Sequence, residues 1–146
     1  MLELYTDGST GPTNPGPGGW AVTTQTEMVL TGWSAGTTNI RMEGAALLAA
    51  LRWLSGRPAV VRTDSRLWVD TLTQWAPVWA GRGWRKGDGS SPANLELVQT
   101  LYQAYRSNAG IDLQWVRGHN GDPGNRLADE WANRARKERL GHARVY

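Results

Sequence analysis

The sequence predicts an α/β fold with a five-stranded mixed sheet flanked by helices. Strand-like segments come first along the chain, and we expect the first three to pair as an antiparallel meander. Strand-like and helix-like segments then alternate, which is typical of parallel pairing with helices on the faces of the sheet. The 146 residues suit one domain, which we expect to span 1–140, followed by a flexible tail over 141–146.

The first three strands are predicted over 2–6, 19–24 and 28–33. Residues 2–6, LELYT, alternate in polarity, and GWAVTT and MVLTGW are apolar runs joined around Gln25-Thr26-Glu27. The stretch GSTGPTNPGPGG over 8–19 is rich in glycine and proline, so we expect a loop without regular structure.

The remaining elements follow from helix formers, caps and short apolar runs. RMEGAALLAALRWL places Leu47, Leu51 and Leu54 on one helical face, and Thr38 or Asn39 can cap this helix. In the last helix Asp122 is the predicted N-cap and Pro123 the first helical residue. The predicted helices are 41–54, 65–74, 93–107 and 122–140, and the predicted later strands are 59–63 and 111–117.

Composition narrows the class of protein. The net charge is +3, carried mostly by arginine, which is compatible both with a polyanionic partner and with a basic protein that has none. Because there is no cysteine, disulfides and thiolate metal sites are excluded. The longest apolar run, Ala45 to Leu51, is too short to cross a bilayer, and no signal pattern opens the chain, so we expect a cytoplasmic protein without a membrane partner.

Four acids are candidate site residues. Two follow strand-like segments in similar motifs, Thr6-Asp7-Gly8 and Thr63-Asp64-Ser65, and two lie near helix starts, Glu43 and Asp129. Each alone has a structural explanation, because a helix start favours an acid and Asp64 can cap the helix that follows it.

Together these acids indicate a metal site. Carboxylates that converge repel one another unless cations neutralise them, and Mg²⁺ prefers oxygen ligands. Two such ions, about 3.5 to 4 Å apart, can promote phosphodiester hydrolysis. A nucleophilic triad has few candidates, because cysteine is absent and His119 and His142 are the two histidines.

Five segments resemble type 1 ribonuclease H of the bacterial kind: YTDGSTGPTNPGPGG, TTNIRMEGAALLAAL, RTDSRLWV, QWAPVWAGRGWRKGD and QWVRGHNGDPGNRLADEWA. They occur in the family's order and cover most of the chain, so the resemblance implies the RNase H-like fold of that family for the mixed sheet and its helices. The resemblance implies an endoribonuclease that cuts the RNA strand of RNA/DNA hybrids and leaves 5′-phosphate and 3′-hydroxyl ends. It further implies a monomer with two Mg²⁺ ions per site in the presence of substrate, for which Mn²⁺ can substitute.

The resemblance also assigns roles within the catalytic set. Asp7 is similar to the ligand that both ions share, Glu43 and Asp64 to its partners at one ion, and Asp129 to the remaining ligand of the other. His119 is similar to a loop histidine that either protonates the leaving 3′-oxygen or assists product release, and both roles stay open.

Substrate-binding residues are implied in the same way. Asn14, Asn39 and Asn94 match positions suited to reading a 2′-hydroxyl, although Asn14 can simply form a turn and Asn39 a cap. Thr38 and Asn94 resemble contacts to a DNA-strand phosphate, and Trp75 resembles a side chain that lies against the DNA backbone. The segment 75–91 resembles a basic protrusion, or else forms an ordinary helix and solvated turn; its candidate contacts are Trp79, Arg82, Trp84, Arg85 and Lys86.

Four departures from the family pattern concern affinity more than chemistry. Gly36 replaces a frequent basic residue, Ile40 an amide, Arg66 an uncharged polar residue and Leu67 an aromatic one. Two other classes of protein remain alternatives: a hybrid-binding module without chemistry, which would need a broken carboxylate set, and a DNA-cutting relative with the same sheet.

Overall fold

The computed structural model describes residues 1–118 and 121–143. Its six-stranded sheet has the order β5-β4-β1-β2-β3-β6. Strands β1, β2 and β3 pair antiparallel, whereas β4 pairs parallel with both β1 and β5. The strands are β1 (Leu2–Thr10), β2 (Gly16–Thr23), β3 (Met28–Thr37), β4 (Ala59–Thr63), β5 (Ile111–Trp115) and β6 (His142–Ala143). The mixed α/β sheet predicted from the sequence is therefore confirmed.

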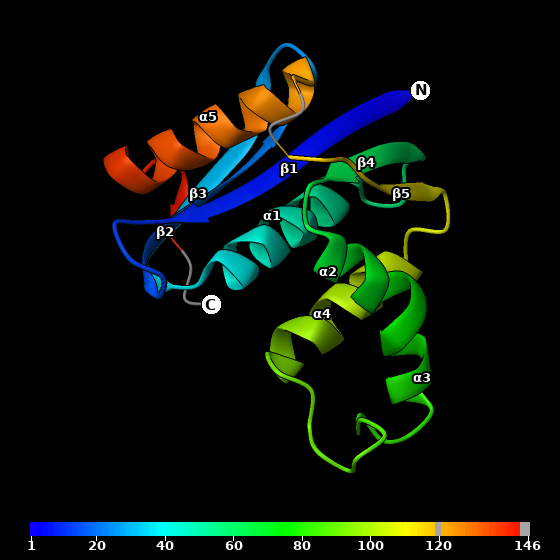
Figure 1. Cartoon of the computed structure of the whole chain (residues 1–146). Helices are drawn as coiled ribbons and strands as arrows, with labels where there is room; N and C mark the ends of the chain where they lie inside the picture. Colours follow the sequence, from blue (N-terminus) through cyan, green and yellow to red (C-terminus); the bar gives the residue numbers. More distant parts are fainter. Residues whose placement is uncertain (119–120, 144–146) are drawn as a thin grey trace.

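Helices cover both faces of this sheet (Figure 1). Helix α1 (Asn39–Leu54) packs on β1 and β2 from one side, and α5 (Pro123–Glu138) packs on β1, β2 and β3 from the other. The remaining helical segments project from the α1 side: α2 (Arg66–Asp70), the π-helical turn η1 (Thr71–Trp75), α3 (Ala76–Ala80) and α4 (Leu95–Arg106). We call residues 66–106 the helical extension.

The glycine-rich stretch 8–19 is more regular than its composition predicts. Strand β1 continues to Thr10 and β2 begins at Gly16, so both cross residues that we expected in a loop. The glycines there serve close packing. A Cβ at Gly8 would lie 2.3 Å from the Glu43 nitrogen, and one at Gly19 would lie 2.4 Å from the Ala132 carbonyl oxygen. These residues let α1 and α5 approach the sheet closely.

Two helices differ from their predicted bounds. Helix α1 starts two residues earlier than expected because Thr38 is its N-cap and accepts a hydrogen bond from the Arg41 N–H. Helical structure after β4 continues to Ala80 instead of ending at Gln74. Pro77 permits this because it lies in the first turn of α3, where a missing N–H is tolerated.

Large rings fill part of the core, as the absence of phenylalanine suggests. Trp20 and Trp68 are fully buried, and the Trp68 indole N–H donates to the Ile40 carbonyl at 2.8 Å. This bond ties the helical extension to the start of α1, beside the residues that the resemblance assigns to substrate binding.

Strand β6 lies in the segment expected to be a flexible tail. It pairs parallel with β3 through His142 and Ala143. Gly141 precedes it with φ +83° and lies so close to Thr31 that a Cβ there would meet the Thr31 carbonyl. Within the described residues no helix is long and apolar enough to span a membrane.

Candidate active site

Asp7 and Asp64 meet because their strands are neighbours. Thr6 of β1 pairs in parallel register with Thr63 of β4, and each aspartate is the next residue along its chain. Asp7 is 5% exposed, and its Oδ1 accepts a hydrogen bond from the Gly8 N–H at 2.8 Å. Parallel pairing therefore converts two similar sequence motifs into one pair of adjacent carboxylates.

Glu43 reaches the same place from α1. Because Gly8 has no side chain, the backbone of Met42 and Glu43 lies directly against β1. Glu43 is in the second turn of α1, since the helix begins at Asn39, and no acidic residue occupies the first turn. This position weakens the interpretation that Glu43 only complements the helix dipole, an effect confined to the first turn.

The backbone around Asp64 is held by β5 and the segment after it. The Val116 N–H donates to the Thr63 carbonyl at 2.9 Å, and the Trp115 indole N–H donates to the Asp64 carbonyl at 3.2 Å. Gly118 approaches the carboxylate so closely that a Cβ there would lie 3.0 Å from Asp64 Oδ2. Two hydrogen bonds thus hold the backbone at Asp64, and Gly118 leaves room for its carboxylate.

Asp7, Glu43 and Asp64 each offer an oxygen atom, and the three atoms lie within 4.8 Å of one another. Asp129 approaches from α5, and its charge acts on Asp7. Asp64 and Asp129 also line a cleft of about 220 Å³ together with Asn125 and Arg126. All four predicted carboxylates therefore face one another or the same cleft, and we call them the carboxylate site.

Burial and mutual repulsion disfavour negative charge at this site. Burial raises the pKa of Asp7 well above its ordinary range, and the charges of Asp64 and Asp129 raise it further. Burial also raises the pKa of Glu43 to about 7; a hydrogen bond from Ser65 lowers it and the charge of Asp64 raises it. Without a counter-ion the ionised forms of these two acids are unfavourable.

The donor set suits a hard divalent cation. It consists of carboxylate oxygens with no nitrogen or sulfur ligand among the described residues, which is the chemistry that Mg²⁺ and Mn²⁺ prefer. A cation would also offset the repulsion that raises the Asp7 and Glu43 pKa values. The type of donor atom and the raised pKa values thus both favour a divalent cation at this site.

A family model described as RNase H matches residues 1–137, almost the whole chain. The chain belongs to the RNase H family. Ribonuclease H of Granulibacter bethesdensis is 43% identical over 143 residues, 94% of this chain and 93% of that protein. Ribonuclease H of Bordetella avium is 42% identical over 137 residues, 91% of this chain and 88% of that protein. The predicted family and enzyme class, a ribonuclease H, are confirmed.

Solved structures agree with this membership. The crystal structure of LC9-RNase H1, a type 1 RNase H with the type 2 active-site motif, superposes with a TM-score of 0.79 at 31% identity and covers 95% of this chain and 73% of that chain. A foamy viral protease-reverse transcriptase in complex with RNA/DNA hybrid superposes with a TM-score of 0.76, covering 93% of this chain and 20% of that chain. At 16% identity the second comparison supports the fold alone.

The amides predicted from the RNase H resemblance form a connected group at the start of α1. Asn39 Oδ1 accepts from the Thr10 N–H at 2.9 Å and from the Thr10 hydroxyl at 2.8 Å. The Asn39 N–H donates to Asn14 Oδ1 at 3.1 Å. Because the Asn39 oxygen is turned toward Thr10, its NH₂ group points elsewhere and can act as a donor to substrate. Of the two predicted caps, Thr38 performs that role.

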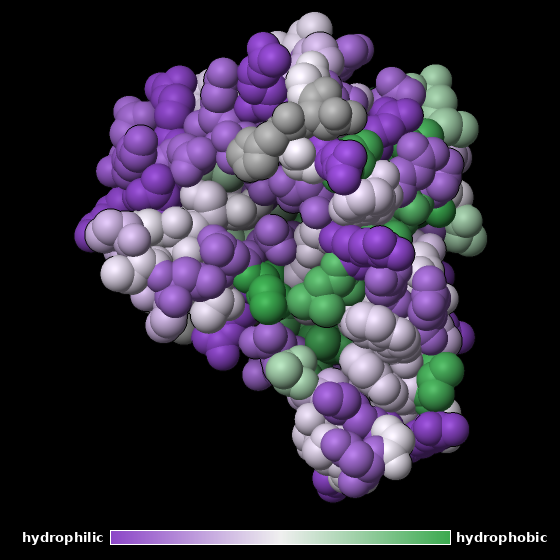
Figure 2. Space-filling model, in the orientation of Figure 1, coloured by the Kyte–Doolittle hydropathy of each residue, from purple (hydrophilic) through white to green (hydrophobic). Residues whose placement is uncertain are grey.

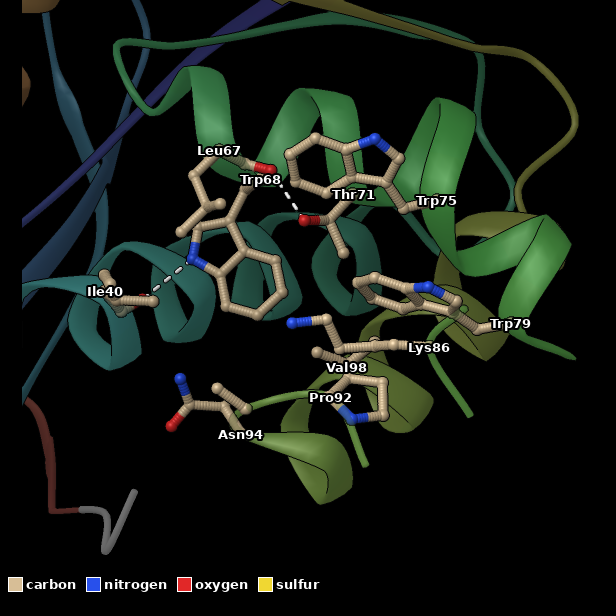
Figure 3. A pocket seen from close by; sticks show the side chains of 11 residues that line it. Ile40, Leu67, Trp68, Thr71, Trp75, Trp79, Lys86, Pro92, Asn94 and Val98 are labelled. Carbon is tan, nitrogen blue, oxygen red and sulfur yellow. Dashed lines mark hydrogen bonds between the residues drawn. The ribbon is translucent and has the colours of Figure 1, made fainter. Parts of the chain in front are cut away.

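Asn94 lies across from this group. It adopts the left-handed region at φ 55°, and its Oδ1 accepts from Arg41 Nε at 3.0 Å. Asn94 also lines an apolar pocket of about 380 Å³ between α1 and the helical extension (Figure 3). The other labelled lining residues are Ile40, Leu67, Trp68, Thr71, Trp75, Trp79, Lys86, Pro92 and Val98.

Two of the sequence departures shape this pocket. Ile40 and Leu67 are 38% and 41% exposed, and both line it beside Trp75, which is 40% exposed. Figure 2 shows hydrophobic surface gathered at the centre of this face, between the layered body and the helical extension. Gly36 and Arg66 do not line the pocket; Arg66 lies over the Trp115 ring at 5.6 Å.

The predicted basic protrusion combines a packed ring with exposed charges. Trp84 has φ 61° and packs edge-on against Tyr102, with ring centroids 5.9 Å apart. The side chains of Arg82, Arg85 and Lys86 are exposed. Trp84 therefore fixes the turn on α4. The three cations are exposed, although Lys86 also lines the apolar pocket and Arg85 donates to the Gly89 carbonyl at 3.3 Å.

Three residues around the carboxylate site were not singled out from the sequence. Ser65 hydrogen bonds Glu43, Trp115 hydrogen bonds Asp64, and Asn133 hydrogen bonds Asp129. Ser65 could have been found, because it follows Asp64 in the quoted motif. Trp115 carries no local signal, because its partner Asp64 is distant in the sequence. Asn133 carries none either, because a polar residue four positions after Asp129 is ordinary on the face of a helix. His119 lies outside the described residues, although its neighbour Gly118 adjoins Asp64.

Proposed function

We propose that this ribonuclease H is an endonuclease that hydrolyses the RNA strand of RNA/DNA hybrids with two divalent cations, giving 5′-phosphate and 3′-hydroxyl ends. The observation that carries the proposal is the convergence of Asp7, Glu43 and Asp64 within 4.8 Å, with Asp129 close enough for its charge to raise the pKa of Asp7. Mg²⁺ is the proposed cation, and Mn²⁺ has the same preference for oxygen donors.

The carboxylates would divide the ligand work by position. Asp7 is central, because it neighbours Asp64 on one side and Asp129 on the other, so we assign it to both cations. Glu43 and Asp64 would complete one site and Asp129 the other. When bound, two such cations activate a water molecule and stabilise the departing oxygen of a phosphodiester.

Other residues of the chain would place the RNA strand and handle protons. The side-chain amides of Asn14 and Asn39, which lie close together because the Asn39 backbone N–H donates to Asn14 Oδ1, are suited to a 2′-hydroxyl that both donates and accepts hydrogen bonds. His119 follows Gly118 in the chain, and Gly118 adjoins Asp64. We therefore propose that His119 either protonates the leaving 3′-oxygen or assists product release.

The DNA strand would follow the apolar pocket. Asn94 lines this pocket and Thr38 is two residues before the lining residue Ile40, so these two would bind a phosphate, and Trp75 offers an exposed ring to the sugar-phosphate backbone. Lys86 in the pocket lining, with Arg82 and Arg85 on the adjoining turn, would contact further phosphates, and Trp79 and Trp84 would hold the segment in place. We propose that a monomer suffices, because all of these residues come from one chain.

Substrate discrimination tests the proposal. The protein is mixed with Mg²⁺ and end-labelled RNA/DNA hybrid, double-stranded RNA or double-stranded DNA, and the products are sized and their ends analysed. We expect cleavage of the RNA strand of the hybrid alone, and no cleavage where consecutive ribonucleotides near the cut are replaced by deoxyribonucleotides. Equal cutting of the all-DNA duplex would instead favour a DNA-cutting relative, and binding without cutting would favour a module without chemistry.

A further inference from the structure

Asn133, Ser9 and Arg136 form a closed hydrogen-bond network beside the carboxylate site. The Ser9 hydroxyl donates to Asn133 Oδ1 at 2.9 Å, and Arg136 NH2 donates to the same oxygen at 3.1 Å. Arg136 Nε donates in turn to the Ser9 hydroxyl oxygen at 3.2 Å. Each member therefore contacts the other two.

This network fixes which way the Asn133 amide faces. A guanidinium can only donate hydrogen bonds, so the atom that meets Arg136 must be the amide oxygen. The NH₂ group is thereby directed to the other side, where it donates to the Asp129 carbonyl at 3.0 Å and lies 3.4 Å from Asp129 Oδ1. One oxygen of a proposed metal ligand thus faces a donor whose orientation Arg136 and Ser9 determine.

The network also joins the two elements that carry Asp7 and Asp129. Ser9 is two residues beyond Asp7 on β1, whereas Asn133 and Arg136 belong to α5. Arg136 is closely fitted, since a Cβ at Gly11 would lie 2.9 Å from its NH1 and one at Gly19 would lie 2.4 Å from its backbone nitrogen. The position of α5 against β1, and with it the spacing of the two aspartates, depends in part on these contacts.

We propose that Asn133 is a positioning residue that holds the Asp129 carboxylate for a divalent cation shared with Asp7, and that Arg136 and Ser9 hold Asn133 in the required orientation. The inference rests on the proposed role of Asp129 as a ligand. Residues that hydrogen bond a metal ligand typically change metal affinity or activity about 10- to 100-fold when they are mutated. Asn133 is expected near the lower limit, because its bond to the carboxylate oxygen is long.

The principal test is Asn133→Leu, which keeps the side-chain shape and removes its hydrogen bonds. Mn²⁺ binding is measured by calorimetry on the protein without nucleic acid, and hybrid cleavage is measured over a range of Mg²⁺ concentrations. We expect Mn²⁺ affinity to fall about tenfold and the half-saturating Mg²⁺ concentration to rise similarly. At saturating Mg²⁺, KM for hybrid should change less than about twofold, because substrate contacts are untouched.

Arg136→Gln tests whether Arg136 orients Asn133, and it leaves Asn133 itself unchanged. This variant also provides the test if Asn133→Leu folds poorly. We expect Mn²⁺ affinity to fall about threefold, with partial recovery in Arg136→Lys, which retains a donor. Arg134→Gln is the matched control on the same helix. Arg134 pairs with Glu138 at 3.0 Å and lies over the Trp131 ring, so its loss should leave Mn²⁺ affinity unchanged.

Two results would overturn the inference. One is unchanged Mn²⁺ affinity in both folded variants, which would make the network a purely structural contact. The other is a raised KM for hybrid with unchanged metal affinity, which would make Arg136 a substrate contact. A wild-type protein that binds Mn²⁺ but does not cut hybrid would count against the proposed function alone, since calorimetry on the variants still decides the positioning role.

Discussion

The carboxylate site buries charged side chains, whereas the helical extension exposes them. Asp7 is 5% exposed and lies among other acids, whereas Arg82, Arg85 and Lys86 are exposed residues beside a packed Trp84. The same contrast applies to apolar groups, because Trp20 is buried in the body but Trp75 is 40% exposed on the extension.

The carboxylate site is therefore suited to chemistry, and the helical extension is suited to binding a polyanion. Buried carboxylates raise one another's pKa, and a bound cation relieves the repulsion between them, so they are suited to a reaction centre. Exposed cations are screened and cost little in the absence of a partner, so they are suited to releasing counter-ions from a polyanion. Mutations in the two regions should therefore change different kinetic and thermodynamic quantities.

The largest expected effect is that of Asp7→Asn. It removes the central negative ligand, so kcat for hybrid cleavage should fall at least about 10³-fold, equivalent to roughly 4 kcal/mol of transition-state stabilisation. Circular dichroism and thermal melting should show an intact fold, because the amide occupies the same space. A folded Asp7→Asn protein with near-normal cleavage would contradict the assignment of the site.

The second prediction concerns Glu43→Gln and the stability of the metal-free protein. Below about pH 4.5 both folded and unfolded states hold the Glu43 proton, and between about 4.5 and 7 only the folded state holds it. The folded state therefore loses stability as pH rises through this window, by up to roughly 3 kcal/mol for a shift of this size. Glutamine has no charge to bury, so the mutant should escape this loss.

Urea unfolding in chelator would measure that difference. We expect Glu43→Gln to be more stable than wild type by about 3 kcal/mol at pH 8 and equal to it at pH 4, with the order at pH 8 reversed by saturating Mg²⁺. A mutant that is less stable than wild type at pH 8 in chelator would show that Glu43 is not under electrostatic strain.

The third prediction moves to the helical extension. Replacing Arg82, Arg85 and Lys86 together with alanine should raise KM for hybrid about tenfold at moderate salt and leave kcat nearly unchanged, because binding is lost equally before and during the reaction. Each phosphate contact removed should flatten the slope of log K against log salt by roughly 0.9. Binding isotherms with Ca²⁺ in place of Mg²⁺ would measure this slope. An unchanged slope and affinity would show that the segment is only a solvated turn that does not contact hybrid.

The smallest expected effect is that of Trp84→Ala. The ring packs against Tyr102 and releases no counter-ion, so its loss should weaken hybrid binding about threefold by loosening the turn. The slope against salt should stay close to that of wild type. If it flattens as much as in the triple mutant, then Trp84 acts by positioning the three cations, and the distinction between packed ring and exposed charge fails.

Much of the fold follows from local pattern, and the errors have particular causes. The strands over 59–63 and the cap at Thr38 agree with the structure because they depend on adjacent residues. The stretch 8–19 was predicted as a loop because glycine signals a turn, whereas Gly8 and Gly19 lie in strands beneath closely packed helices. Composition cannot distinguish these two uses of glycine. The pairing of β6 with β3 likewise joins segments more than a hundred residues apart.

The sequence by itself determined the residue types of the site, its family motifs and the order of elements, because these depend on chemistry and on short-range periodicity. Only the tertiary structure decided that Thr6 and Thr63 pair in register, which brings Asp7 beside Asp64, and that Gly8 admits Glu43 to the same point. It also decided that Trp115 contacts Asp64 and that Asn133 contacts Asp129. Their partners are set by how β5 and α5 pack on the sheet, and such packing is a property of the whole chain, not of any local segment.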